Sequence, residues 1–155
     1  MHIKEPSHIL GKLVEVALGV SPVFNITGTN WPTRDGTGIR DYIHVWDLAL
    51  AHIKAVEKFD DVIEMDADQE IPYAVINLGT GKGVTVREMV DAFEHVYGEA
   101  IPTIEQEPRP GDVAGAYANA NKAHELLGWI AEQPIEKGIE DALRWGEIRD
   151  DILDY

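Results

Sequence analysis

The feature that most constrains the fold of this chain is a mainly apolar run, Tyr73–Leu78 (YAVINL). Apolar residues on both alternating faces are typical of a strand that is covered from both sides, as in a parallel sheet. A Gly-rich turn at 79–83 follows, and Thr85 with Glu88 makes a capping box that opens the next helix. Strand, turn and helix in this order predict a mixed α/β fold.

The same order raises the alternative of a nucleotide-binding loop. The glycines of 79–83 do not support it, because Val84 stands where G-x-G-x-x-G needs its last glycine and the Walker spacing is not met either. Thr85 already satisfies the start of the helix. We therefore interpret 79–83 as a structural turn.

The rest of the sequence predicts mostly helices and few strands. We expect extended segments at 23–27, 101–106 and 116–118, an acidic loop at 60–70, and helices at 8–18 capped by Ser7, at 48–58 capped by Asp47, at 121–128 capped by Asn121 and after Pro134. These strands are too few to flank Tyr73–Leu78. That strand is therefore expected to belong to a sheet completed by something else.

Length and charge restrict the class of function. The 155 residues can bury one good core, so we expect one domain, 1–155, or a fragment of something larger. A net charge of −15 argues against nucleic acid and anionic membranes as partners, and no apolar run is long enough for a membrane span. The chain has no secretion-signal pattern, and its lack of cysteine says nothing positive about the compartment, so the cytoplasm is the default location. Its six histidines lack zinc-site spacing, which favours structural roles over metal binding.

A first candidate for ligand chemistry is Gly36–Val45. In a strand, Arg40, Tyr42 and His44 would share one face, and a guanidinium beside a phenol suits a nucleotide diphosphate. Spacing alone favours the plainer interpretation, a loop that enters a partly buried strand.

A second candidate is the stiff turn Pro108–Asp112. There Arg109 can hold phosphate while Asp112 accepts hydrogen bonds from ribose hydroxyls. Taken alone, this segment is better explained as a surface turn with a local Arg–Asp pair.

Together these motifs resemble the C-terminal half of the UDP-galactose (UDP-glucose) 4-epimerase family, which are extended short-chain dehydrogenases/reductases. Trp31–Val45 followed by Asp47–Ala49 is close to the family's P-T-x-D-G-T-x-x-R-D-Y-I-H-V-x-D-L-A, a motif that separates epimerases from sugar-nucleotide dehydratases. Asn77–Gly81 is similar to its N-L-G-x-G, Arg109–Asp112 resembles R-x-G-D, and Lys122–Trp129 resembles K-A-x-x-x-L-x-W. The resemblance spans nearly the whole chain. It implies a C-terminal substrate-binding domain with a strand and helix that would complete a missing Rossmann sheet.

The resemblance also implies roles for individual residues. Arg40 and Arg109 would clamp the UDP diphosphate. Tyr42 would contact the phosphate–sugar end, and Asp112 the uridine ribose.

Three positions depart from the usual family residue. Thr27 stands where an aromatic residue often faces the uracil ring, so Asn25, Ile26 and backbone groups would contribute more here. His8 stands where many members have Asn. Ala116 occupies the gatekeeper position at which bulky Tyr goes with plain hexoses, so we hypothesise tolerance of the N-acetyl sugars UDP-GlcNAc and UDP-GalNAc.

The family's NAD-binding half, with its glycine fingerprint and its catalytic Ser/Thr and Tyr-x-x-x-Lys, has no counterpart in this sequence. In the family's reaction, part of galactose metabolism, NAD takes hydride from sugar C4 and returns it to the opposite face. We therefore expect the UDP-sugar-binding portion of an isomerase, with no NAD bound by this chain alone and no activity alone. The alternative is a non-catalytic UDP-sugar-binding module, or a subunit that docks on a separate NAD-binding chain. Self-association through the uncovered Tyr73–Leu78 strand is expected as well.

Overall fold

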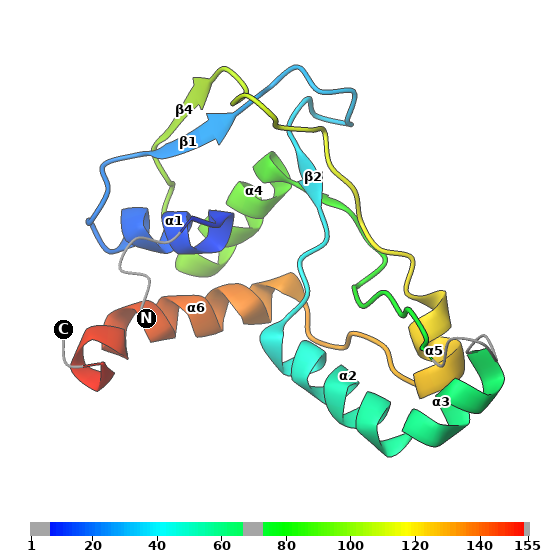
Figure 1. Ribbon diagram of the computed structural model, residues 1–155. Coiled ribbons are helices and arrows are strands. Elements are labelled where there is room, and N and C mark those ends of the chain that lie inside the picture. Colours follow the sequence, from blue (N-terminus) through cyan, green and yellow to red (C-terminus); the bar gives the residue numbers. More distant parts are fainter. Residues whose placement is uncertain (1–6, 67–72, 154–155) are drawn as a thin grey trace. The chain divides into compact units, whose positions relative to one another are not determined.

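The computed structural model describes residues 7–66 and 73–153, which are arranged in two compact units (Figure 1). Unit 1 comprises Met1–Ile39, Val84–Gly115 and Ile135–Tyr155, and unit 2 comprises Arg40–Gly83 and Ala116–Pro134. Each unit is therefore assembled from segments that are distant in sequence. Within the described ranges, no helix is both long and apolar enough to cross a membrane.

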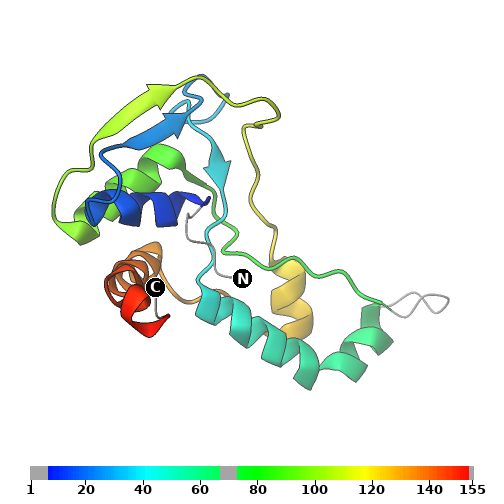
Figure 2. The ribbon, with the colours of Figure 1, turned by 60° about the vertical axis from the view of Figure 1, so that its left-hand side comes forward.

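Unit 1 is a small α/β layer with a two-stranded parallel sheet. Its elements are α1 (Ile9–Ala17), β1 (Phe24–Thr27), β3 (Val84–Thr85), α4 (Val86–Tyr97), β4 (Thr103–Gln106) and α6 (Ile135–Ile152); the short strand β2 (Ile39–Arg40) pairs with β3 and begins in unit 1. Strand β1 runs parallel to β4, with Phe24 opposite Thr103 and Thr27 opposite Gln106. Helices α1 and α4 lie along one side of this pair, and α6 packs on both helices (Figure 2). The extended segments expected at 23–27 and 101–106 are thus confirmed.

The helix boundaries of unit 1 follow from their caps. Thr85 and Glu88 form the expected capping box, and Gly98 ends α4 in the left-handed conformation, with φ of +86°. Ser7 was expected to cap α1 with its hydroxyl, but it does not. Instead, Nδ1 of His8 accepts the N–H of Gly11 at 3.2 Å, because an imidazole nitrogen can satisfy a free N–H of the first turn as an Asn side chain does.

The loop between β1 and β2 is held against α4 by the partly buried carboxylate of Asp35. Asp35 accepts from the N–H and the hydroxyl of Thr37, at 2.8 and 2.7 Å, and from the hydroxyl of Thr85. Both threonines are fully buried. Burial raises the pKa of Asp35, but these hydrogen bonds outweigh it and the net pKa lies below the usual value. Arg34 pairs with Glu88, and its hydrogen bond lowers the pKa of that carboxyl.

Unit 2 is mainly helical. Its helices are α2 (Val45–Glu57), α3 (Phe59–Asp66) and α5 (Asn121–Leu127). Their buried core consists of Ala51, Val62, Ala123, Leu127 and Trp129. Gly128 ends α5 with φ of +63°, as expected.

The start of α2 corrects an expectation. Asp47 is not the N-cap, because the helix begins at Val45 and Nδ1 of His44 accepts the N–H of Trp46 at 3.0 Å. Asp47 is instead 1% exposed and accepts the N–H groups of Glu132 and Gln133, at 3.1 and 2.9 Å. Its carboxylate therefore fixes the segment that follows α5.

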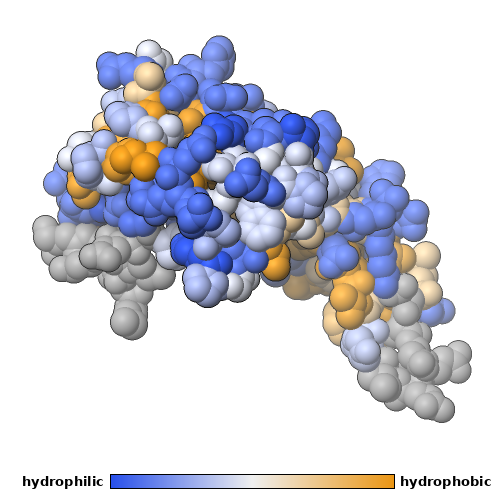
Figure 3. Space-filling model, turned by 90° about the horizontal axis from the view of Figure 1, so that it is seen from above, coloured by the Kyte–Doolittle hydropathy of each residue, from blue (hydrophilic) through white to orange (hydrophobic). Residues whose placement is uncertain are grey.

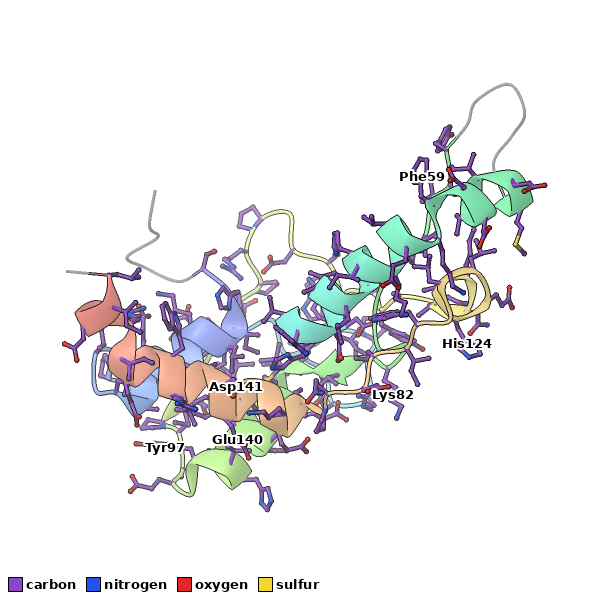
Figure 4. All side chains as sticks on the ribbon, turned by 90° about the horizontal axis from the view of Figure 1, so that it is seen from below. Phe59, Lys82, Tyr97, His124, Glu140 and Asp141 are labelled. Carbon is purple, nitrogen blue, oxygen red and sulfur yellow. The ribbon has the colours of Figure 1, made fainter. Side chains whose placement is uncertain are left out.

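Helix α3 replaces the first part of the acidic loop that was expected at 60–70; residues 67–70 lie outside the described residues. The helix forms because Val62 packs into the unit 2 core while the acidic side chains of Asp60 and Asp61 stay outside. Phe59 lies at the junction of α2 and α3 and is 61% exposed (Figure 4). Val56 is likewise exposed.

The strand expected at Tyr73–Leu78 is not formed. The segment pairs with no strand among the described residues, and its burial alternates: Ala74, Ile76 and Leu78 pack against the unit 2 core, whereas Tyr73 and Val75 are 60% and 65% exposed. An extended chain becomes a strand only through hydrogen bonds to a neighbour, and the described residues supply none here. The strand itself is therefore absent from this structure, one apolar face is uncovered as anticipated, and burial of both faces in a completed sheet stays a prediction.

Two smaller expectations were also wrong. No strand forms at 116–118, and the chain instead makes a single parallel bridge between Ile39 and Gly115. Asn121 is the first residue of α5 rather than its cap, and its N–H donates to Oδ1 of Asn119 at 3.0 Å.

Candidate functional site

The carboxyl ends of β1 and β4 border a hollow of about 380 Å³ in unit 1. It is lined by Gly28–Trp31 on one side and by Glu105–Pro108 on the other. Gly28 has φ of +76°, and a Cβ there would lie 3.2 Å from Cε2 of Trp31 and 3.3 Å from Cβ of Pro108. The indole therefore packs tightly across this backbone. The carboxyl edge of parallel strands is where open α/β sheets bind ligands.

The polar groups of the hollow are arranged for an uncharged ligand. Glu105 accepts hydrogen bonds from Arg87 and Thr29, and the bond from Arg87 holds the pKa of this carboxyl below its usual value. Nε2 of Gln106 donates to Oδ1 of Asn25 at 3.1 Å, which fixes both amides at the end of the sheet. Carboxylates and amides beside an indole suit a planar ring that exchanges hydrogen bonds, and the carboxylates repel phosphate.

The turn after this hollow holds Arg109 and Asp112 together. The N–H of Asp112 donates to the carbonyl of Arg109 at 3.0 Å, and Gly111 has φ of +89°, so Arg109–Asp112 is a type II turn with Pro110 at its second position. Oδ2 of Asp112 accepts the N–H of Arg109 at 2.9 Å and lies 3.5 Å from its Nε. The local pair is present, and the Arg109 side chain is 73% exposed.

The first candidate segment is organised differently from the strand that we expected. Strand β2 ends at Arg40, so the alternation of Arg40, Tyr42 and His44 on one face was wrong beyond that residue. The chain leaves the ladder because Asp41 turns to other partners and His44 caps α2. Burial raises the pKa of Tyr42, and the positive charge of Arg40 partly offsets this. The guanidinium and the phenol are therefore electrostatic neighbours.

Sequence reasoning missed the part played by Asp41. Its carboxylate accepts from the N–H and the hydroxyl of Thr80, at 3.0 and 2.6 Å, and from the N–H groups of Gly81 and Ala118, at 3.3 and 3.2 Å. A Cβ on Gly79 would lie 2.8 Å from that of Ala118, so the three chain segments meet closely. Two features of the sequence could have indicated this role. An acidic residue stands between two ligand candidates, and the Gly-rich turn has no carboxylate or amide side chain of its own to accept its N–H groups.

The expected site residues are divided between the units. Asn25, Thr27, Arg109 and Asp112 belong to unit 1, where Asn25 and Thr27 lie on β1 beside the hollow. Arg40, Tyr42 and Ala116 belong to unit 2. The pairing of Arg40 with Arg109 stays a prediction. In the described parts of the chain, no cluster of three His, Cys, Asp or Glu side chains could hold a metal ion.

Comparison with known proteins adds an independent line of argument. Residues 5–142 match the family model described as GDP-mannose 4,6 dehydratase. The chain belongs to this family. Within the GDP-mannose 4,6 dehydratase family, it is similar to UDP-glucose 4-epimerases and shares their extended short-chain dehydrogenase/reductase fold. The expected family and fold class are therefore confirmed.

Three relatives illustrate the extent of this similarity. A UDP-glucose 4-epimerase of Drosophila melanogaster is 42% identical over 141 residues, which cover 91% of this chain and 39% of that protein. The epimerase of Stenotrophomonas maltophila, solved with bound NAD and formylated UDP-arabinopyranose, superposes with a TM-score of 0.86 at 33% identity, covering 98% of this chain and 43% of the other. That of Bifidobacterium longum, in complex with NAD+ and UDP, gives 0.81 at 36% identity, covering 92% and 40%. The chain thus spans about two fifths of the length of these relatives.

The Gly-rich turn at 79–83 does not fit the phosphates of a dinucleotide. The N–H groups of Thr80 and Gly81, which a phosphate would need, already donate to the carboxylate of Asp41. A second anion at this place would be repelled. Lys82, labelled in Figure 4, is exposed and its N–H donates to the hydroxyl of Thr80. These contacts support a structural turn, and no NAD chemistry is assigned to it.

Proposed function

We propose that this chain is the UDP-sugar-binding portion of a NAD-dependent UDP-glucose 4-epimerase. The observation that carries the proposal is the hollow of unit 1, which adjoins the Arg109–Asp112 turn at the carboxyl ends of β1 and β4. An acidic and aromatic hollow suits a nucleobase, and the turn beside it offers a carboxylate for ribose and an exposed guanidinium for phosphate.

In this proposal each segment binds one part of the ligand. The uracil ring enters the hollow between Trp31 and Gln106, with Asn25 and Thr27 on the adjoining strand β1. Asp112 exchanges its bond with Arg109 for the ribose hydroxyls. Arg109 is then free to bind the diphosphate together with Arg40 of unit 2, while Tyr42 contacts the phosphate–sugar end. Arginine suits the diphosphate because its planar fork binds two oxygens at once.

In this proposal Ala116 determines which sugars are accepted. A methyl side chain leaves room beside the sugar, so we propose that UDP-GlcNAc and UDP-GalNAc are accepted as well as UDP-glucose and UDP-galactose. In the complete reaction NAD would oxidise and reduce sugar C4. This chain would bind and orient the sugar nucleotide but would not turn it over alone, since the sequence has no Tyr-x-x-x-Lys.

A second candidate is a non-catalytic UDP-sugar-binding module that docks on a separate NAD-binding chain or on a second copy of itself. The observation that favours it is the apolar surface of unit 2, where the side chains of Trp46, Ile53, Tyr73 and Val75 are exposed. Figure 3 shows apolar side chains interrupting the polar surface on the face that it presents. Such side chains are usually covered in an assembly. Light scattering would detect the second copy as a mass above that of one chain.

Titration with UDP in a calorimeter tests the first proposal. We expect saturable binding by the wild-type chain, and weaker binding when Arg109 becomes Ala. Arg149→Ala is the matched control, since Arg149 lies on α6 and pairs with Asp150. An absence of binding at millimolar UDP would contradict the proposal. An epimerase assay of the chain alone separates enzyme from module, and measurable turnover would refute the claim that it is inactive by itself.

A further inference from the structure

The carboxylate of Asp41 connects separate segments of unit 2, and neither the proposed ligand contacts nor the helices require it. It accepts four hydrogen bonds, two from Thr80 and one each from Gly81 and Ala118. Three of the four donors are backbone N–H groups that are not used in any helix. The carboxylate therefore fixes the main chain of two separate segments, 79–81 and the region of Ala118.

The position of Asp41 in the sequence gives these bonds a consequence for the ligand. Arg40 and Tyr42 precede and follow it directly, and both are proposed contacts of the diphosphate and the sugar. Ala118 is two residues from Ala116, the proposed contact of the sugar substituent. One side chain thus ties the segment of Arg40 and Tyr42 to the segment of Ala116.

We infer that Asp41 is a positioning residue that holds Arg40, Tyr42 and Ala116 in the register needed for the diphosphate and the sugar. This inference rests on the proposed function and concerns only unit 2. The side chain itself does not contact the ligand, because both of its oxygens are engaged by the protein.

An ionised carboxylate suits this task better than an amide. Each oxygen of Asp41 receives two donors, Oδ1 from Thr80 and Oδ2 from Gly81 and Ala118. In Asp41→Asn one oxygen becomes an NH₂ group, so on that side two donors would face each other and no hydrogen bond could form. Either the contact with Thr80 or the contact with the other segment is then lost, whereas the size of the side chain is unchanged.

The experiment compares uridine with UDP as ligands, using ligand-observed NMR on the wild-type chain and on Asp41→Asn. Uridine reports on the hollow of unit 1, and the extra affinity for UDP reports on the diphosphate contacts. We expect the affinity for uridine to stay the same while that for UDP falls about tenfold, the equivalent of one strong hydrogen bond to a charged group. Thr80→Val, which removes one donor to Asp41, should give a smaller loss in the same direction, and Thr80→Ser should restore UDP binding.

Asp47→Asn is the matched control for a purely structural role. Asp47 is also in unit 2 and also accepts two backbone N–H groups, but its bonds fix Glu132 and Gln133. Both bonds end on Oδ2, so the oxygen of Asn can still accept them, and the variant should leave the ratio of UDP to uridine affinity unchanged. An unchanged ratio in Asp41→Asn, or an equal fall in Asp47→Asn, would overturn the inference and leave the proposed function intact. Absence of UDP binding by the wild type would instead refute the proposed function.

Discussion

Removal of the Asp35 carboxylate should destabilise the loop that carries Trp31 and leads to Arg40. In Asp35→Ala the buried hydroxyls of Thr37 and Thr85 and the N–H of Thr37 lose their acceptor. Each unpaired buried donor costs about 1–3 kcal/mol, but Asp35 is only partly buried, so water can replace some of the bonds that are lost. We therefore expect a loss of about 2–4 kcal/mol in the free energy of unfolding of unit 1.

Amide hydrogen exchange on α4 measures this loss in unit 1 without interference from unit 2. Asp35→Asn is the graded control: its oxygen can still accept both bonds from Thr37, so it should lose only about 1 kcal/mol, from the contact with Thr85. Equal exchange rates in the wild type and Asp35→Ala would show that these hydrogen bonds do not stabilise the loop. Equal losses in the two variants would show that the number of hydrogen bonds accepted by residue 35 does not determine the loss in the free energy of unfolding.

Four further predictions concern the ligand, the caps and pH. Arg40→Lys should weaken UDP binding by about 1–3 kcal/mol, because the charge stays but the two-pronged contact is lost; calorimetry with Arg149→Lys as control checks this, and an unchanged affinity would return Arg40 to a surface role. Ala116→Tyr should lower the affinity for UDP-GlcNAc relative to UDP-glucose, and an unchanged ratio in competition binding would count against the gatekeeper role. His8→Ala should cost about 1 kcal/mol of α1 stability while His8→Asn should cost little, as read by hydrogen exchange; equal effects would exclude the cap. The pKa values of Asp35 and Glu88 are lower in the folded chain than the ordinary 3.8 and 4.5, so their stabilisation is complete above those values and is lost as pH falls below them; acid unfolding followed by tryptophan fluorescence should show this loss, and a flat stability below pH 4.5 would contradict it.

Local signals in the sequence were sufficient to predict much of the secondary structure of unit 1. The capping box of Thr85 and Glu88 and the stop at Gly98 depend on side chains within one turn, so they can be recognised without knowing the tertiary structure. The caps made by His8 and His44 were missed because histidine is rarely considered an N-cap, although its Nδ1 accepts like an amide oxygen.

Features that depend on distant segments were not predictable in the same way. The Tyr73–Leu78 run has the composition of a strand, but pairing is decided by a neighbour that the sequence of the run does not encode. Asp47 has the character of a cap, yet the N–H groups of Glu132 and Gln133, distant in sequence, determine its role. The family motifs indicated the proposed ligand contacts. The role of Asp41, which accepts hydrogen bonds from the segments around them, could be recognised only from the structure.

The discontinuous build of unit 1 has a consequence for biosynthesis. Strand β1 has its parallel partner in β4, and α1 and α4 have theirs in α6, which follows the whole of unit 2 in the chain. While translation proceeds, the faces of α1 and α4 that pack on α6 therefore have nothing to cover them until α6 has been synthesised. Such an intermediate is a natural target for chaperones and is prone to aggregate. Slow codons or chaperone binding before α6 should therefore affect the yield of folded protein more than changes within unit 2.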